Sequence, residues 1–77
     1  MNQEQKDAAV QAILFMADND SHGAKAALDT EFAPEIKDKL YDFLWYSEEL
    51  CDIQNCIADL VYDTEMVIQE ITEELEG

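Results

Sequence analysis

Apolar residues in the first part of the chain recur at the spacing of an α-helix. They fall on one stripe between about Gln3 and Ala17, which predicts a helix over this range. Asn2 and Gln5 have the spacing of a capping box, in which each side chain binds the other residue's backbone N–H. The run "DNDSHG" that follows is rich in turn-forming residues and predicts the end of this helix. The stripe consists of Ala9, Val10, Ile13, Leu14, Phe15, Met16 and Ala17.

The rest of the chain predicts one short helix and one long one. The alanine-rich segment "AKAALDTEF" predicts a helix over about residues 22–30. Pro34 suits the first turn of the next helix, because its backbone angle is helical and its missing N–H is not needed there. Residues 35–76 contain no Gly or Pro, so a continuous helix would have 42 residues and a length of about 63 Å. Breaks are possible at "WYSEE" (45–49) through its serine and at "YDTE" (62–65) through its Asp or Thr.

A heptad pattern runs through both candidate breaks and favours the continuous helix. With Leu40 at position a, apolar residues fill most a, d and g positions, and Gln54 and Thr64 place polar groups in the seam, where they can fix register. Two short helices cannot cover about 60 Å of this stripe, whereas a second copy can. We therefore expect an all-α fold, with two short N-terminal helices and one long C-terminal amphipathic helix (35–76), that forms a dimeric helical bundle. The alternative is a monomeric bundle in which the long helix folds back near residue 63. The expected dimer interface is Leu40, Phe43, Leu50, Ile53, Ile57, Leu60, Val61, Val67, Ile68 and Ile71.

Charge is distributed unevenly along the chain. There are 19 acidic residues against 4 lysines, and the formal net charge is −15. Residues 1–39 hold all four lysines and eight acids, whereas residues 40–77 hold eleven acids and no basic residue. Such a field repels nucleic acid and anionic membranes and attracts basic protein surfaces, most commonly those that bind nucleic acid. The competing interpretation is that the acids only keep an apolar helix soluble.

Several functional classes find no support in the sequence. Hydrophobic residues make up 48% of the chain, enough to fold residues 1–77 as a single helical domain. No secretion signal or long apolar run is present, so we expect a cytoplasmic protein with no membrane association. Cys51 and Cys56 lie too far apart on a continuous helix for a disulfide, and no Cys/His cluster suggests zinc. No catalytic motif surrounds His22, so we expect neither an enzyme nor a cofactor.

Residues 18–29 partly resemble a calcium-binding loop. Asp18, Asp20, Gly23 and Asp29 match positions 1, 3, 6 and 12 of that motif. Positions 5 and 8 hold a histidine and a lysine, and the last acid is an aspartate rather than the usual bidentate glutamate. We therefore interpret the run as a turn that ends a helix, with a weak cation site as the alternative.

In the same heptad register, the acids of the C-terminal half form a ridge opposite the apolar stripe. Only Glu65 and Glu74 depart from it. One chain would carry a charge about every 5 Å of helix, against about 1.7 Å of axis in duplex DNA, so imitation of DNA is expected only of a dimer. Trp45 and Tyr62 also lie on the ridge, and exposed aromatic residues favour a specific protein target unless the N-terminal helices cover them. The residues expected to bind a partner are Asp42, Trp45, Glu48, Glu49, Asp52, Asp59, Tyr62 and Asp63.

In size, acidity and lack of catalytic motifs, the chain resembles the small acidic helical proteins with which phages and mobile elements inhibit host defence. These include anti-CRISPR, anti-restriction and anti-BREX proteins. The resemblance implies a stoichiometric inhibitor on a basic surface of a nuclease, ATPase or DNA-binding subunit, and it assigns no functional residue. We therefore expect a non-enzymatic inhibitor, potentially a DNA mimic, that does not itself bind nucleic acid. The alternatives are a regulatory or assembly subunit whose apolar stripe binds a partner helix, and a divergent calcium sensor.

Overall fold

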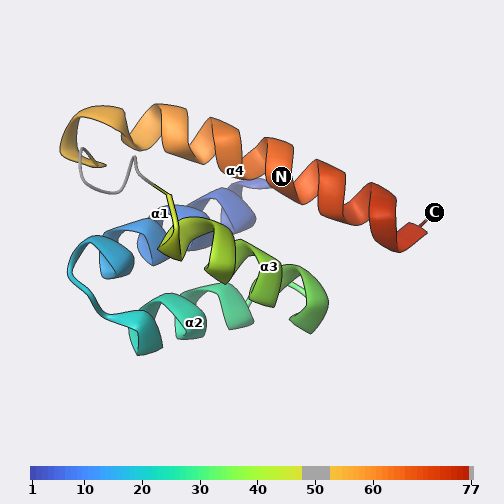
Figure 1. Ribbon diagram of the computed structural model, residues 1–77, viewed down its shortest axis with the longest axis horizontal. Helices are drawn as coiled ribbons and strands as arrows, with labels where there is room; N and C mark the ends of the chain where they lie inside the picture. The colour runs from blue at the N-terminus through green and yellow to red at the C-terminus, as the bar shows by residue number, and fades with distance from the viewer. Residues whose placement is uncertain (48–52, 77) are drawn as a thin grey trace.

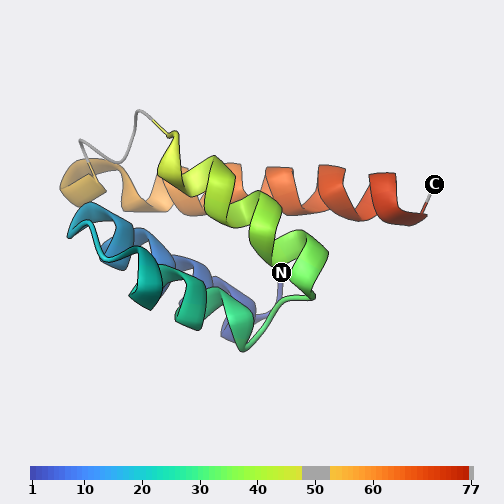
Figure 2. The same cartoon turned by 60° about the horizontal axis from the view of Figure 1, so that its bottom comes forward.

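Four helices make up the part of the chain that the structure describes. The computed structural model describes residues 1–47 and 53–76, with the side chains of 53–56 excepted. The helices are α1 (Gln3–Ala17), α2 (Ser21–Asp29), α3 (Pro34–Trp45) and α4 (Ile53–Glu76). Consecutive helices run in opposite directions (Figure 1). Because α1 and α3 each pack against both α2 and α4, the helices surround a common core (Figure 2). The expectation of an all-α fold is confirmed.

The first helix begins and ends where the sequence predicts. The Oδ1 atom of Asn2 accepts a hydrogen bond from the backbone N–H of Gln5 at 2.7 Å, and Gln5 Oε1 accepts one from the N–H of Asn2 at 3.2 Å. The predicted capping box is therefore present. After α1, Asn19 adopts a left-handed φ of 60°, a conformation in which asparagine is enriched. Asp20 then caps α2 by accepting from the N–H of Gly23 at 2.9 Å. Residues 18–20 are thus a helix-ending turn, as interpreted from the sequence, whereas the rest of the 18–29 run is α2.

The long helix predicted for residues 35–76 is not present. A helix begins at Pro34, as expected, but it ends at Trp45, and α4 begins at Ile53. α3 ends at Trp45, the first residue of the "WYSEE" candidate, whereas α4 passes through Asp63 and Thr64 without a break. Both the continuous helix and the fold-back near residue 63 are therefore wrong. The physical reason is that two shorter helices bury their apolar faces inside one chain, and tertiary packing outweighs local helical continuity.

The core lies between the four helices. Ile13 of α1, Leu28 of α2, Leu40 and Leu44 of α3, and Leu60 of α4 are completely buried. The heptad pattern thus identified the buried face of α4 correctly, but α1 and α3 of the same chain cover it. The partly buried apolar residues packed against this core are Met1, Phe15, Ala27, Ile36, Tyr41, Phe43, Ile57, Val61, Val67 and Ile68.

Thr64 carries a polar group into the interior of the single chain. Its side chain is fully buried, and its hydroxyl donates to the backbone carbonyl of Leu60 at 2.7 Å. A threonine hydroxyl bonded one turn back along its own helix is satisfied without a partner from another element. Thr64 therefore needs no second copy to satisfy it. The side chain of Gln54, the other polar group predicted in the seam, lies outside the described residues.

Candidate interaction surface

Two lysines of neighbouring helices form ion pairs with acidic side chains of α4. Lys6 of α1 lies 3.4 Å from a carboxylate oxygen of Glu65, and Lys39 of α3 lies 2.9 Å from one of Glu74. These two glutamates are the acids that depart from the predicted ridge. Their departure from the outward-facing positions of the heptad therefore has a structural reason: they turn towards lysines of α1 and α3. All of these side chains are partly exposed, so each pair contributes little to the free energy of unfolding, typically about 0–1 kcal/mol.

The other two lysines join α2 to α3. Lys37 Nζ donates to Asp29 Oδ1 at 2.6 Å, and this hydrogen bond raises the pKa of Lys37 above its ordinary value. Asp29, the last residue of the calcium-type motif, is thus committed to a lysine. Lys25 of α2 lies over the ring of Tyr41, with its Nζ 4.6 Å from the ring centroid. Each lysine of the chain therefore contacts a group on a different helix.

The outer face of α4 presents acids that have no such contact. The acids on this face are Asp59, Asp63, Glu70, Glu73 and Glu76, and among the described residues none of the five forms an ion pair. Two large side chains, Tyr62 and Met66, stand between them and are 61% and 45% exposed. Exposed tyrosine and methionine side chains within an acidic surround distinguish this face from a merely solvated one. We call this set the α4 outer face: Asp59, Tyr62, Asp63, Met66, Glu70, Glu73 and Glu76.

The spacing of the α4 outer face places its central residues in a line. Asp59, Tyr62, Met66 and Glu70 follow one another at intervals of three or four residues, which puts them on one side of the helix over about 17 Å. The five acids of the α4 outer face span about 26 Å from Asp59 to Glu76, or one charge every 5 Å or so. That density is about a third of that of duplex DNA. The single chain therefore does not reproduce the charge spacing of a phosphate backbone.

The residues predicted to bind a partner separate into two groups. Trp45 of α3 is 44% exposed and stacks on Tyr41, with 6.3 Å between ring centroids and 10° between planes. Since Lys25 of α2 lies over the ring of Tyr41, this pair lies on α3 next to α2. Asp42 is exposed on α3, and Tyr46, which the sequence did not single out, is 78% exposed beside Trp45. Asp59, Tyr62 and Asp63 lie on α4, and Glu48, Glu49 and Asp52 lie outside the described residues.

Most residues predicted at a dimer interface lie in or against the core of the single chain. The dimer was predicted because the apolar stripe was expected to be exposed in a single chain. In the structure, other helices of the same chain cover most of that stripe. The homodimer itself stays a prediction, which a measurement of molecular mass in solution decides. The same burial leaves less of the stripe for a partner helix, the basis of the alternative assembly function. Leu40, Leu60 and Ile71 are buried, Phe43, Ile57, Val61, Val67 and Ile68 pack against the core, and Leu50 and the side chain of Ile53 lie outside the described residues.

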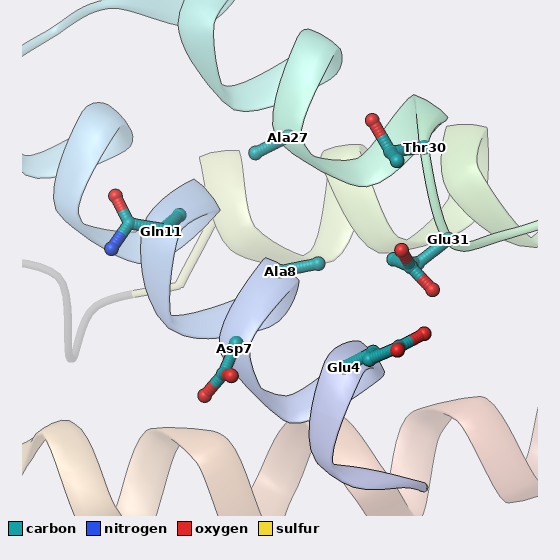
Figure 3. A pocket seen from close by; sticks show the side chains of 7 residues that line it. All are labelled: Glu4, Asp7, Ala8, Gln11, Ala27, Thr30 and Glu31. Atoms are coloured by element: carbon teal, nitrogen blue, oxygen red, sulfur yellow. The ribbon is translucent and has the colours of Figure 1, made fainter.

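An open hollow between α1 and α2 is a feature that the sequence did not reveal. It has a volume of about 330 Å³ and includes Ala8 and Ala27 in its lining. Figure 3 shows the carboxylates of Glu4 and Glu31 at one end, and Asp7, also in the lining, accepts a hydrogen bond from a side chain of its own helix. The described residues contain no group of three or more His, Cys, Asp or Glu that could hold a metal ion. Apart from its two alanines, the hollow is lined by polar and acidic side chains.

Comparison with known proteins gives no family for this chain. No protein-family model matches it, and neither a curated protein nor a solved structure is significantly similar. Within the described ranges, no helix combines the length and apolarity that crossing a bilayer requires. Any functional conclusion therefore rests on the charges and contacts of the chain itself.

Proposed function

We propose that the protein is a non-enzymatic inhibitor that places the α4 outer face on a basic surface of another protein, a surface that otherwise binds nucleic acid. The observation that carries this proposal is the combination of five unpaired acids with exposed Tyr62 and Met66 on one helix. The acids supply attraction to a basic surface and speed the encounter. The two large side chains supply anchors of the kind that dominate binding energy at protein interfaces.

The partner must bring its own positive charge. Three of the four lysines are paired with carboxylates inside the chain, and Lys25 lies over an aromatic ring. A second copy would bring a further net charge of −15 to the α4 outer face and would have to break these contacts to offer a cation. A basic protein meets the same face with opposite charge at no such cost. Charge complementarity therefore favours a different protein as the occupant of this face.

The shape of the α4 outer face favours docking of a helix into a groove. Tyr62 and Met66 are separated by one helical turn, the spacing at which amphipathic helices place anchors in a partner's apolar groove. The flanking acids would then meet basic residues on the rim of that groove. Because nucleic-acid-binding sites are the commonest basic surfaces of proteins, occupation of such a rim would exclude nucleic acid from it. This is inhibition by competition, and it does not require the charge spacing of DNA.

A matched pair of charge-reversed variants tests the proposal. One variant carries Asp59→Lys, Glu70→Lys and Glu73→Lys on the α4 outer face. The control carries Glu4→Lys, Asp18→Lys and Asp38→Lys, which are exposed acids outside α4 and change the net charge equally. Each protein is immobilised through a terminal tag, exposed to a bacterial lysate freed of nucleic acid, and the retained proteins are identified by mass spectrometry. A captured protein is then purified, and its binding to duplex DNA is measured with each variant as competitor.

We expect the wild-type chain and the control to capture the same nucleic-acid-binding protein and to displace DNA from it. The α4 variant should lose both properties while it keeps the helical content of the wild type. Equal capture by the two variants would show that the α4 outer face is not the binding surface. A captured protein whose DNA binding is unaffected by saturating wild-type chain would refute inhibition by competition.

A further inference from the structure

Two tyrosines of this chain show contrasting surroundings. The ring of Tyr41 is partly buried and has Lys25 over its face at 4.6 Å. Tyr62 lies on the α4 outer face, is 61% exposed, and among the described residues its ring makes no cation–π contact. The fold thus contains one filled cation–π site, and it presents a second aromatic face to solvent in a more acidic setting.

An unpaired carboxylate neighbours Tyr62 on its own helix. Asp59 lies three residues before it and Asp63 immediately after it, while Met66 lies one turn further along. On an α-helix, residues three and four apart are neighbours on the surface, with about 5–6 Å between their Cβ atoms. A cation over the Tyr62 ring would therefore also lie within reach of the Asp59 carboxylate. The flexible thioether side chain of Met66 adds an apolar surface beside the ring.

We infer that the partner residue seated on Tyr62 is an arginine, with its guanidinium stacked on the ring and hydrogen-bonded to Asp59. This inference rests on the proposed function and names the chemistry of the partner at its centre. The acids alone would attract lysine and arginine alike. The Tyr62 ring favours arginine over lysine, because a planar, weakly hydrated guanidinium stacks on an aromatic face while its N–H groups still bind a carboxylate. The ammonium of lysine is a compact and strongly hydrated charge that gains less from an exposed ring.

The aliphatic part of an arginine also suits this face. Arginine buries its methylene stem along apolar surface and keeps its charged end among polar groups. Met66, 45% exposed and one turn from Tyr62, offers such a surface. The expected partner site is therefore an arginine that projects from a groove with an apolar lining, which agrees with docking of α4 as a helix.

Two labelled peptides of equal charge test this inference on the intact chain. One alternates glycine with arginine and the other alternates glycine with lysine, and their affinities are measured by fluorescence anisotropy at low salt. The quantity of interest is the ratio of the two dissociation constants. It is compared among the wild type, Tyr62→Leu, Tyr62→Phe and the control Tyr46→Leu, which removes an exposed tyrosine outside α4. Because Tyr62 and Tyr46 are exposed, these variants should retain the fold, and circular dichroism checks that they do.

The wild type should bind the arginine peptide more tightly than the lysine peptide. Tyr62→Leu should reduce this preference roughly two- to five-fold, the range expected of an exposed cation–π contact. Tyr62→Phe and Tyr46→Leu should leave the preference unchanged. A preference that survives in Tyr62→Leu, or that falls equally in Tyr46→Leu, overturns the inference.

The same assay separates failure of the inference from failure of the proposed function. The variant with Asp59, Glu70 and Glu73 reversed to lysine should bind both peptides more weakly than the control triple variant. If it does while the arginine preference is insensitive to Tyr62, only the arginine assignment is wrong. If the two triple variants bind both peptides equally, the α4 outer face is not a basic-partner surface and the proposed function fails as well.

Discussion

Gly23 is the position at which a conventional helix-stabilising substitution should weaken this protein. It lies near the start of α2, and a Cβ atom built on it would approach Phe15 Cδ1 to 2.7 Å and Phe15 Cγ to 2.9 Å. The Cγ atom is close to the backbone of α1, so the ring cannot avoid the contact by a small rotation. The same Cβ would lie 2.7 Å from Asp20 Oδ2, the carboxylate that caps α2 through its other oxygen. Gly23→Ala therefore strains both the packing of α1 on α2 and the cap.

The opposing contributions give the sign of the effect. Replacing glycine by alanine inside a helix normally stabilises it by about 1 kcal/mol. Overpacking of a closely filled contact typically destabilises by about 1–3 kcal/mol. A disturbed N-cap destabilises by a further 1 kcal/mol or so. We therefore expect Gly23→Ala to lower the free energy of unfolding by about 1–3 kcal/mol, the opposite of the effect of helix propensity alone.

Urea unfolding followed by circular dichroism measures this change, with His22→Ala as the control. His22 is exposed at the preceding position, so its substitution should change stability by no more than about 0.5 kcal/mol. In a Phe15→Ala background the obstructing ring is absent, and Gly23→Ala should become neutral or stabilising. If Gly23→Ala stabilises the protein while Phe15 is intact, the close approach of α1 to α2 is not as described.

Two further predictions concern α4 and the contact between α2 and α3. Leu60→Ala should lower the free energy of unfolding by about 2–5 kcal/mol, because Leu60 is fully buried. Since helices of the same chain bury Leu60, the urea midpoint of unfolding should not vary with protein concentration. A midpoint that rises with concentration would show that a second copy contributes to the stability of the fold. Lys37→Met should lower the melting temperature at neutral pH, because it removes the hydrogen bond to Asp29 that raises the pKa of Lys37 in the folded state. A raised pKa means that this contribution is complete below the ordinary lysine value of 10.5 and is lost as pH rises through the higher folded-state value, so the two melting temperatures should converge above pH 10.5. A difference that stays constant there would contradict the assigned role of the pair.

Local signals in the sequence predicted the N-terminal elements well. The capping box of Asn2 and Gln5, the turn after Ala17 and the helix start at Pro34 each depend on residues within a few positions of one another. Such features have the same physical cause in a peptide as in the folded chain, so a single sequence suffices to find them. The apolar face of α4 was also recognised, because helical periodicity depends only on the order of residues.

The sequence offered "WYSEE" as a candidate break, but the heptad pattern favoured a continuous helix, because the choice between the two depends on the whole fold. No Gly or Pro marks the break, and the heptad register continues from Leu40 to Ile71 as though the helix were unbroken. What selects the break is that α4 finds its cover on α1 and α3, a distant contact that periodicity cannot express. The candidate interaction surface was divided for the same reason. Trp45 and Tyr62, assigned to one ridge of one helix, belong to two different helices.

The uneven distribution of charge along the sequence also acquires a meaning only in the folded chain. The half that holds every lysine supplies the cations for Glu65 and Glu74, in the half that has none. A count of acids and bases in each half cannot show these ion pairs between the two halves. The pairs do explain why two glutamates lie away from the ridge that the other acids form.

The placement of the lysines has a consequence for covalent modification. Because each lysine contacts a group on another helix, acetylation would remove a positive charge from a contact within the fold and leave the α4 outer face chemically unchanged. Methylation would keep the charge and should disturb these contacts less. An amine-reactive label or acetyl group would therefore weaken contacts between helices without altering the α4 outer face, whereas modification of carboxylates would change both, because Asp29, Glu65 and Glu74 are the partners of the lysines. Lysine modification thus tests the packing of the helices separately from the binding proposed for the α4 outer face.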